Sequence, residues 1–362
     1  MGSRAMADSS SISDSLEAVT RGYRRLNESA GLVDRSSRVR LKISGPDRAK
    51  FLHNLTTNEI KKLLPSKGRE TFVTSPQGKT LGFLTVLATQ EGFLLVRTDP
   101  QGANLVLPHL NKYGIFDDVA IEDESASTFE LHIAGPRAED LVASIAGVMP
   151  GGDDLNHSMS SVDGIPIRLI RESPTGRPGF TIIGESAGSN EIRSRLRQQG
   201  QAAGIGDLEI DEAAFSAMRI EAGTPVFGQD LTEKNLPQEL GRDARAISFV
   251  KGCYLGQETV ARIDALGHVN QMLRGFRSDS PAERFEAGDV LQAGGKPVGH
   301  LTSVAYSPGW NRWVALGYLR ESARQAEAPL SIVRQDGREI GRVIVCELPM
   351  IPPLPSDAET LG

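Results

Sequence analysis

The chain has 362 residues, of which 39% are hydrophobic and 24% are charged, and its formal net charge is −6. This length exceeds the range in which one hydrophobic core keeps growing, so we expect two or three packed domains. No apolar run reaches the roughly 20 residues that cross a bilayer, and the negative charge argues against direct nucleic-acid binding, so neither a membrane nor a nucleic acid is an expected partner.

The first 20 residues form a polar, Ser-rich segment that we predict to be a disordered lead-in. The segment lacks the apolar stretch of a secretory signal, and Asp8 and Asp14 argue against a transit peptide. The whole chain has only two cysteines, too few for a disulfide framework. We therefore expect a reducing compartment: the cytoplasm, or the mitochondrial matrix if the source is a eukaryote.

A strand, a Gly-Pro turn and a helix follow one another twice in the first half of the chain. Residues 38–43 alternate apolar and polar side chains before the turn at Gly45-Pro46, and residues 129–145 repeat the pattern around Gly135-Pro136. Proline fits the first helical position, where its missing N–H costs nothing. Two such units predict a duplicated α+β half. The alternative is that this common combination occurs twice by chance.

Further strands and a helix are predicted between and beyond these units. Residues 81–98 read as a hairpin of two buried strands that turns near residues 90–92, and residues 190–200 read as a solvated helix. From about Gly275 onward, short β runs are separated by the turn pairs 294–295 and 336–337. This spacing predicts a separate, small β-barrel at the C-terminal end. Cys346 lies in one of its strands, where we expect a small buried hydrophobic side chain.

The stretch KGCYLGQE, residues 251–258, is the strongest candidate for chemistry. Gly252 and Gly256 flank Cys253, and a helix-compatible segment follows. A helix N-terminus and the nearby Lys251 both favour the thiolate form, so Cys253 could be a nucleophile, a redox sensor or a sulfur ligand. The alternative is an inert loop cysteine. No CxxC or HExxH spacing predicts a metal site, and we expect none.

A second candidate site lies near this cysteine in the sequence. Residues 242–277 contain six Arg or Lys and three Asp or Glu, a local excess that suits an anionic ligand or a solvated face equally well. Upstream, Arg219 could grip a carboxylate and Glu221 could accept from the N–H edge of a heterocycle. The alternative for these two residues is an ion pair within the helix or loop. No Ser/His/Asp order, Walker loop or GxGxxG occurs in a suitable context.

The strings RIEAGTPVFGQDL and KGCYLGQE resemble those of the YgfZ-type folate-binding proteins, relatives of the T-protein (aminomethyltransferase) of the glycine cleavage system. The resemblance implies an α+β cloverleaf of two interleaved α+β domains with a C-terminal β-barrel around a folate channel. On this basis we expect the folate-binding region at residues 21–268, the barrel at 269–350 and a tail at 351–362. It also implies tetrahydrofolate or a derivative as the cofactor.

The same resemblance assigns roles to individual residues. It places Arg219 and Glu221 at the folate site, assigns Lys251, Tyr254, Gln257 and Glu258 to cofactor binding, and makes Cys253 the reactive thiol. It implies an accessory role in the assembly or repair of iron-sulfur clusters, including those of enzymes that modify tRNA. The expected partners are then a reduced folate and iron-sulfur enzymes or their assembly machinery.

Two departures from the T-protein pattern bear on activity. Gly82 and Phe83 stand where T-proteins carry an acidic pair that assists aminomethyl transfer, and Arg177 stands where they carry an acidic residue that holds the pterin. Neither Gly82 nor Phe83 can act as an acid or base. We therefore expect no glycine-cleavage aminomethyl transfer. Two alternatives remain: a folate-dependent methyl or aminomethyl transferase, and a non-catalytic scaffold that retains the fold.

Overall fold

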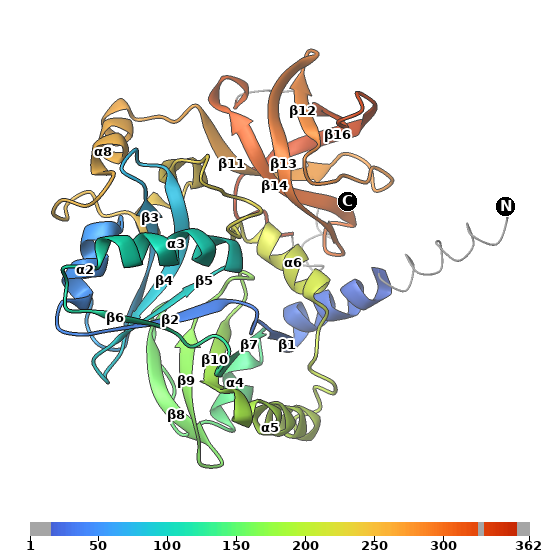
Figure 1. Cartoon of the computed structure of the whole chain (residues 1–362). Coiled ribbons are helices and arrows are strands. Elements are labelled where there is room, and N and C mark those ends of the chain that lie inside the picture. The colour runs from blue at the N-terminus through green and yellow to red at the C-terminus, as the bar shows by residue number, and fades with distance from the viewer. Residues whose placement is uncertain (1–15, 325–328, 353–362) are drawn as a thin grey trace.

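The computed structural model describes residues 16–324 and 329–352, which build two five-stranded sheets and a closed β-barrel (Figure 1). The first described element is a helix over residues 16–28. Residues 16–20 were expected in a disordered lead-in, but they begin this helix because its apolar face is buried. Tyr23 and Leu26 pack there against Ala217 and Met218. Residues 1–15 lie outside the described part.

The first sheet has the antiparallel strand order β3-β4-β5-β2-β6. Two helices, α2 (Arg48–Leu55) and α3 (Pro100–Tyr113), supply Phe51, Leu52, Val106 and Leu110 to the hydrophobic core on one of its faces. Its strands are β2 (Val39–Ser44), β3 (Lys67–Thr74), β4 (Thr80–Ala88), β5 (Leu94–Thr98) and β6 (Ala120–Asp123). The predicted hairpin of residues 81–98 is confirmed, because β4 pairs with β5.

The second sheet has the antiparallel order β1-β7-β10-β9-β8. Its core face is covered by α4 (Ala138–Ala143) and by α5 (Ser189–Ala202), which follows the short helix η1 (Ser186–Gly188). Ile192 and Leu196 of α5 are buried there, so the predicted solvated helix has one apolar face. The strands are β1 (Gly31–Asp34), β7 (Thr128–Ala134), β8 (His157–Val162), β9 (Ile165–Arg171) and β10 (Gly179–Glu185).

The two sheets are interleaved along the sequence. β1 pairs with β7 in the second sheet, and all five strands of the first sheet lie between these two in the chain. The predicted repeat is confirmed: β2 leads through Gly45 into α2, and β7 leads through Gly135 into α4. Each turn therefore starts the helix that covers its own sheet.

A segment of short helices and longer loops connects the second sheet to the barrel (Figure 1). It contains α6 (Glu212–Glu221), η2 (Pro237–Leu240), α7 (Asp243–Ala246) and α8 (Gln257–Leu266). The predicted helix after the cysteine stretch is confirmed as α8. Ile220 of α6 packs against Leu316 and Tyr318 of the barrel, so α6 bridges the barrel and the rest of the chain.

The barrel closes in the antiparallel order β11-β14-β13-β12-β15-β16 around a core that includes Phe276, Leu291 and Val343. Its strands are β11 (Gln271–Ser278), β12 (Val290–Ala293), β13 (Lys296–Ser307), β14 (Arg312–Arg320), β15 (Leu330–Val333) and β16 (Glu339–Cys346), with η3 (Glu321–Ala323) after β14. The predicted turns at residues 294–295 and 336–337 join β12 to β13 and β15 to β16. Cys346 is partly buried in β16. Among the described residues, no helix is long and apolar enough to span a bilayer.

Candidate functional site

A cavity of about 420 Å³ lies where the two sheets meet the loop after α6. The first sheet contributes Phe83 and Thr85 from β4, and the second contributes His132 from β7 and Thr181 from β10. This volume falls within the roughly 300–1,000 Å³ of ligand pockets. The cavity can therefore hold a small molecule with polar groups. Its charged lining consists of five arginines (Arg35, Arg38, Arg219, Arg242, Arg245) and five carboxylates (Glu70, Asp99, Glu130, Asp154, Glu172).

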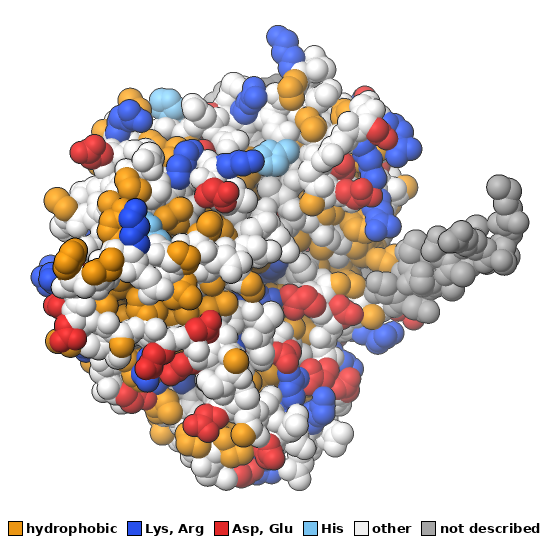
Figure 2. Space-filling view, viewed as in Figure 1, with side chains coloured by type: hydrophobic (Ala, Val, Ile, Leu, Met, Phe, Trp, Pro, Cys, Tyr) orange, Lys and Arg blue, Asp and Glu red, His pale blue; other side chains and the backbone are white. Residues whose placement is uncertain are grey.

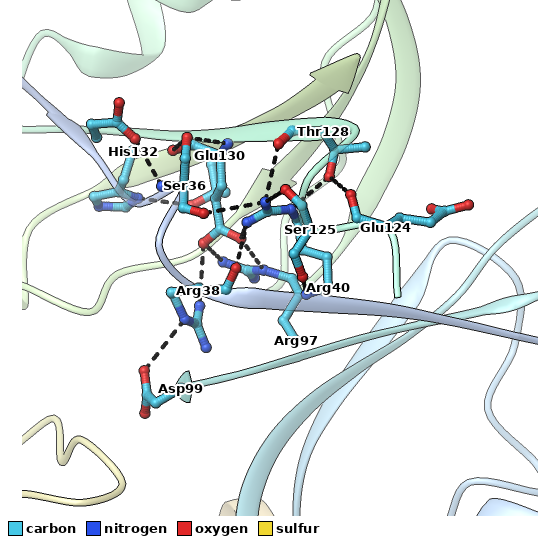
Figure 3. Close-up of polar contacts among 12 residues, drawn as sticks. Ser36, Arg38, Arg40, Arg97, Asp99, Glu124, Ser125, Thr128, Glu130 and His132 are labelled. Atoms are coloured by element: carbon cyan, nitrogen blue, oxygen red, sulfur yellow. Dashed lines mark hydrogen bonds and ion pairs between the residues drawn. The ribbon is translucent and has the colours of Figure 1, made fainter. Parts of the chain in front are cut away.

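A buried ion-pair network joins the two sheets at the cavity wall. Arg97 of β5 donates to the Glu130 carboxylate of β7 at 2.7 and 3.2 Å, and to the Glu172 carboxylate at 2.8 and 2.9 Å. Figure 3 shows Arg38, Arg40 and Arg97 gathered around Glu130. Arg40 and Arg97 are fully buried, so each guanidinium depends on these partners in place of water.

Three charges of the network, those of Glu172, Glu130 and Arg97, are stabilised by their partners. Burial alone would raise the pKa of Glu172, but Arg97 outweighs it and holds that pKa well below its ordinary value. Burial also opposes the charge of Glu130, whose pKa Arg97 and Arg38 lower. Burial would lower the pKa of Arg97, and the two carboxylates raise it instead. These three groups are therefore ionised at neutral pH.

A hydrogen-bond chain extends from this network to His132. The Thr181 hydroxyl donates to the Glu172 carboxylate and lies 2.9 Å from Nδ1 of His132. His132 is only 2% exposed, and burial lowers its pKa to about 4. The cavity wall therefore contains a neutral imidazole at pH 7, held in place through Thr181.

Arg219 lies in the cavity wall, but its guanidinium already has partners. Nη1 donates to Asp230 at 3.0 Å, and Nη2 donates to Gln229 and Ser303 at 2.9 Å each. The structure thus shows the alternative interpretation, an ion pair with the loop, in place of a free grip on a ligand carboxylate. Asp230 in turn accepts from Thr302 of β13, so the pair fixes the loop against the barrel.

Glu221, at the end of α6, is enclosed between the first described helix and the barrel. Its carboxylate accepts from the Tyr23 hydroxyl at 3.0 and 3.1 Å and from the Ser307 hydroxyl. The side chain is 2% exposed and is not among the described residues that line the cavity. Burial raises its pKa to about 7 despite these hydrogen bonds. Glu221 was expected to accept from the N–H edge of a heterocycle. In the structure it accepts from the hydroxyls of Tyr23 and Ser307 instead.

Lys251 and Tyr254 are buried parts of the cysteine stretch. Nζ of Lys251 donates to the carbonyl oxygens of His53 and Thr56 at 2.5 Å and of Asn58 at 3.0 Å, at and just after the end of α2. Such carbonyls have no partner within their own helix, so Lys251 caps it. Nζ of Lys251 therefore binds backbone carbonyls, and burial lowers its pKa to about 7. An effect of Lys251 on the Cys253 thiol stays a prediction.

Cys253 is exposed and lies in a surface hollow, not in the cavity. The described residues lining this hollow include Phe51, Leu55, Tyr113 and Tyr254. Hydrophobic side chains gather on this face over α2 and α3 (Figure 2). The expected single site, with Cys253 beside a folate-lined cavity, thus divides in two. The reason is that Lys251 anchors the stretch at the end of α2, on the helix side of the first sheet.

The remaining residues of the stretch shape its backbone. Gln257 begins α8 and its side chain accepts from the backbone N–H of Tyr254, while Glu258 is exposed in the first turn. Gly256 has φ 84°, and a Cβ there would lie 2.3 Å from the Ser75 carbonyl oxygen. Gly252 meets no such constraint, with nothing within 4 Å of an added Cβ. Only the second of the two flanking glycines is sterically required.

The two departures from the T-protein pattern have clear surroundings. A Cβ at Gly82 would lie 2.3 Å from Val106 Cγ2 of α3, so no acidic side chain fits there. Phe83 stacks on Phe72 with ring centroids 5.1 Å apart and faces the cavity. Arg177 donates to Asn27 at 2.6 and 2.9 Å. Gly82 and Phe83 therefore pack within the chain, Arg177 hydrogen-bonds within it, and none of the three supplies a carboxylate.

Sequence analysis did not identify His132, Thr181 or Glu172. A signal was present in β7, whose alternate residues Phe129, Leu131 and Ile133 form the core face. Glu130 and His132 occupy the other face, yet they are as buried as the apolar set. Ionisable groups at alternate positions of a strand would normally indicate a solvent face, so the pattern alone suggested exposure.

The chain is similar to known proteins along most of its length. Residues 9–251 match the GCVT N-terminal domain, and residues 271–351 match the glycine cleavage T-protein C-terminal barrel domain. A candidate transferase of Arabidopsis thaliana chloroplasts is 29% identical over 322 residues, which cover 88% of this chain and 71% of that protein. An aminomethyltransferase of Streptomyces avermitilis is 27% identical over 295 residues, covering 80% of this chain and 78% of that enzyme.

The fold is also similar to a solved structure. The glycine cleavage system aminomethyltransferase T from Bartonella henselae superposes with a TM-score of 0.80, over 92% of this chain and 89% of that one, at 19% identity. This similarity confirms the predicted fold class of two α+β domains and a C-terminal barrel. These comparisons identify T-protein relatives and do not distinguish the YgfZ-type branch.

Proposed function

This chain belongs to the family of the glycine cleavage T-protein, and on that premise we propose that it binds a reduced folate in the cavity and transfers a one-carbon unit to or from it. Aminomethyltransferases of the family use tetrahydrofolate, and several similar proteins are named aminomethyltransferases. The cavity between the sheets is the observation that carries this proposal, because it has the size and the polar lining that such a ligand needs.

Arg38 supports an anionic or carbonyl-bearing ligand in the cavity. Its Nε is buried, and among the described residues no hydrogen-bond acceptor satisfies it. The Asp99 carboxylate lies 3.6 Å from this Nε, while Nη1 of Arg38 donates to Glu130 at 3.3 Å. A buried donor without an acceptor costs free energy, which a ligand oxygen in the cavity would recover.

The partner that exchanges the one-carbon unit with the folate is proposed to differ from the partner in the glycine cleavage reaction. Gly82 cannot be replaced by a carboxylate without displacing α3, and Phe83 presents an aromatic ring to the cavity. Without an acid or base at these positions, aminomethyl transfer loses the group that assists it in T-proteins. Turnover with the other components of that system, above a blank without this protein, would contradict this part of the proposal.

Calorimetric titration with tetrahydrofolate under anaerobic conditions tests the binding proposal. The wild type should bind, and Thr85→Trp, which fills the cavity from β4, should abolish the heat. Met159→Trp is the matched control, because Met159 is exposed on β8 and does not line the cavity. Absence of binding by the wild type, or equal binding by Thr85→Trp, would overturn the proposal.

A second candidate function is specifically favoured by the exposure of Cys253. Exposed apolar residues adjoin, along the chain, the residues that line its hollow. Phe249 and Val250 precede Cys253, and Ile115 and Phe116 follow α3. We propose that this face could serve an accessory role toward iron-sulfur enzymes or their assembly machinery. Cells lacking the homologous protein, supplied with Cys253→Ser or Cys346→Ser, test it. Full recovery of iron-sulfur enzyme activity with Cys253→Ser would exclude a role for the thiol.

A further inference from the structure

Tyr254 belongs to the cysteine stretch, and its ring is buried in a hydrophobic cluster of the first sheet. The side chain lines the surface hollow at Cys253 and is only 9% exposed. It is not among the described residues that line the cavity between the sheets. The Lys251 ammonium lies 4.8 Å from the centroid of the Tyr254 ring, so the ring is held between this charge and the cluster.

An aromatic pair connects Tyr254 with the cavity. Phe72 of β3 is fully buried and belongs to the same cluster as Tyr254. Phe83 of β4 packs against this cluster, stacks on Phe72 with ring centroids 5.1 Å apart, and lines the cavity. Protein interiors are close-packed, so they transmit displacements. A shift of Tyr254 therefore reaches the cavity wall through Phe72 and Phe83.

The backbone of β3 ties the same two places together. Successive side chains of a strand alternate between the two faces of its sheet, so Glu70, Phe72 and Thr74 share one face. Glu70 lines the cavity. The Thr74 hydroxyl donates at 2.5 Å to the carbonyl oxygen of Leu255, the residue after Tyr254. The strand thus runs from the cavity wall to the cysteine stretch, and the turn between β3 and β4 lies beside α8 (Figure 1).

The segment that leads to Tyr254 is anchored at the cavity as well. Arg242 and Arg245 line the cavity and donate to the Glu70 carboxylate at 2.6–3.2 Å. Ala246, the next residue, is buried in the cluster that contains Tyr254. One short stretch of chain therefore contributes in turn to the cavity wall, to the cluster and to the hollow.

We propose that Tyr254 is a positioning residue of the cavity: through Phe72 it sets the place of Phe83, and its displacement weakens ligand binding. This inference rests on the proposed folate function and adds a residue that acts on the cavity from outside it. A gap of about 0.5–1 Å already forfeits a quarter to a half of the dispersion energy of a contact. Coupling between separate positions typically changes affinity by about 5- to 150-fold, so we expect a loss of about fivefold or more.

Anaerobic calorimetric titration with tetrahydrofolate tests the role of Tyr254. Tyr254→Phe keeps the ring and should bind as the wild type does, whereas Tyr254→Leu should bind about fivefold more weakly or worse. Phe129→Leu is the matched control, because Phe129 is 3% exposed in the core of the second sheet and does not line the cavity. Its affinity should equal that of the wild type. Equal weakening in Phe129→Leu, or full affinity in Tyr254→Leu, would overturn the inference and leave folate binding intact.

Labels on Cys253 displace Tyr254 without a substitution in the cluster, and they serve if Tyr254→Leu does not fold. In a Cys346→Ala background, N-phenylmaleimide adds a bulky group in the hollow that Tyr254 lines, and methyl methanethiosulfonate adds a small one. The bulky label should weaken tetrahydrofolate binding about fivefold or more, and the small label should leave it unchanged. Equal affinities of the two labelled forms would overturn the inference.

Amide hydrogen exchange tests the same connection without a ligand. In the protein with the bulky label, amides of β4, which carries Phe83, should exchange faster, and those of β9 in the second sheet should not change. Unchanged exchange in β4 would overturn the inference. If the unlabelled wild type does not bind tetrahydrofolate, the proposed function fails, and the exchange result alone then decides whether Tyr254 positions Phe83.

Discussion

Arg97 of the first sheet and Glu172 of the second make a two-bond contact, with Nη1 and Nη2 of Arg97 at 2.9 and 2.8 Å from the carboxylate oxygens. Arg97 is the last residue but one of β5, and Glu172 directly follows β9. The same guanidinium holds Glu130, so one side chain ties the two interleaved domains together at the cavity wall.

Arg97→Met should lower the free energy of unfolding by about 3–5 kcal/mol, because it leaves the Glu172 carboxylate without its cation and removes one of the three arginines around the buried Glu130. Urea denaturation measures this change. Arg21→Met is the control, since Arg21 forms an exposed pair with Glu17 at 3.7 Å, and its loss should cost at most about 1 kcal/mol. Equal losses in the two variants would mean that the buried network does not stabilise the domain junction.

His132→Phe and His157→Phe should each flatten the pH dependence of stability in acid. Both pKa values are depressed by burial from 6.5 to about 4, so between these values the unfolded chain binds a proton that the folded chain refuses. Their contribution is present above pH 6.5 and is lost as the pH falls toward 4. Near pH 5 each replacement should reduce the slope by about 1.4 kcal/mol per pH unit. His268→Phe, at an exposed position, should leave the slope unchanged.

Glu221→Gln should show the opposite sign. Burial raises the pKa of Glu221 from 4.5 to about 7, so the folded state binds a proton that the unfolded state has lost between these values. That contribution is present below pH 4.5 and disappears as the pH rises through 7. The variant should match the wild type at pH 4.5 and exceed its stability at pH 8, by a few kcal/mol at most, because glutamine keeps a neutral partner for Tyr23 and Ser307. Denaturation at the two pH values decides this, and a variant less stable than wild type at pH 8 would contradict it.

Lys251→Met and Cys253→Ala should have very different effects on stability, although both residues belong to the cysteine stretch. Loss of the Lys251 ammonium leaves three buried carbonyls after α2 without a donor, which should cost about 2–3 kcal/mol or more. Cys253 is exposed, so its replacement by alanine should change stability by no more than about 0.5 kcal/mol. Thermal melts compare the two variants. In the native wild type, alkylation should reach Cys253 well before the partly buried Cys346, and the reverse order would contradict this arrangement.

Much of the fold could be predicted because local signals agree with it. The turns at Gly45 and Gly135, the hairpin before residue 98 and the turns of the barrel all depend on neighbouring residues. The prediction for residues 16–20 was wrong. These residues follow a polar, Ser-rich segment, and the helix that they begin has an apolar face that can be recognised only from its packing against α6.

The site was harder to predict because its contacts are distant in the sequence. Arg97, Glu130 and Glu172 belong to three different strands or their ends, and no spacing brings them together before the sheets face each other. The family resemblance assigned both Cys253 and Arg219 to one folate-dependent function, whereas the structure places them in different hollows. Buried Lys251 separates them in space by anchoring the cysteine stretch to α2.

Because the two sheets are interleaved along the sequence, their strands must pair in a set order while the chain is being synthesised on the ribosome. The strands of the first sheet, from β2 to β6, are continuous in the sequence and can pair as soon as they emerge. β1 is made before them but must wait for β7, roughly 100 residues later, which at about 5–20 residues per second is a delay of about 5–20 s. During that interval the nascent chain carries an unpaired strand ahead of a finished domain. Slowed translation before β7 would lengthen the time for which this strand is open to pairing with a neighbouring nascent chain.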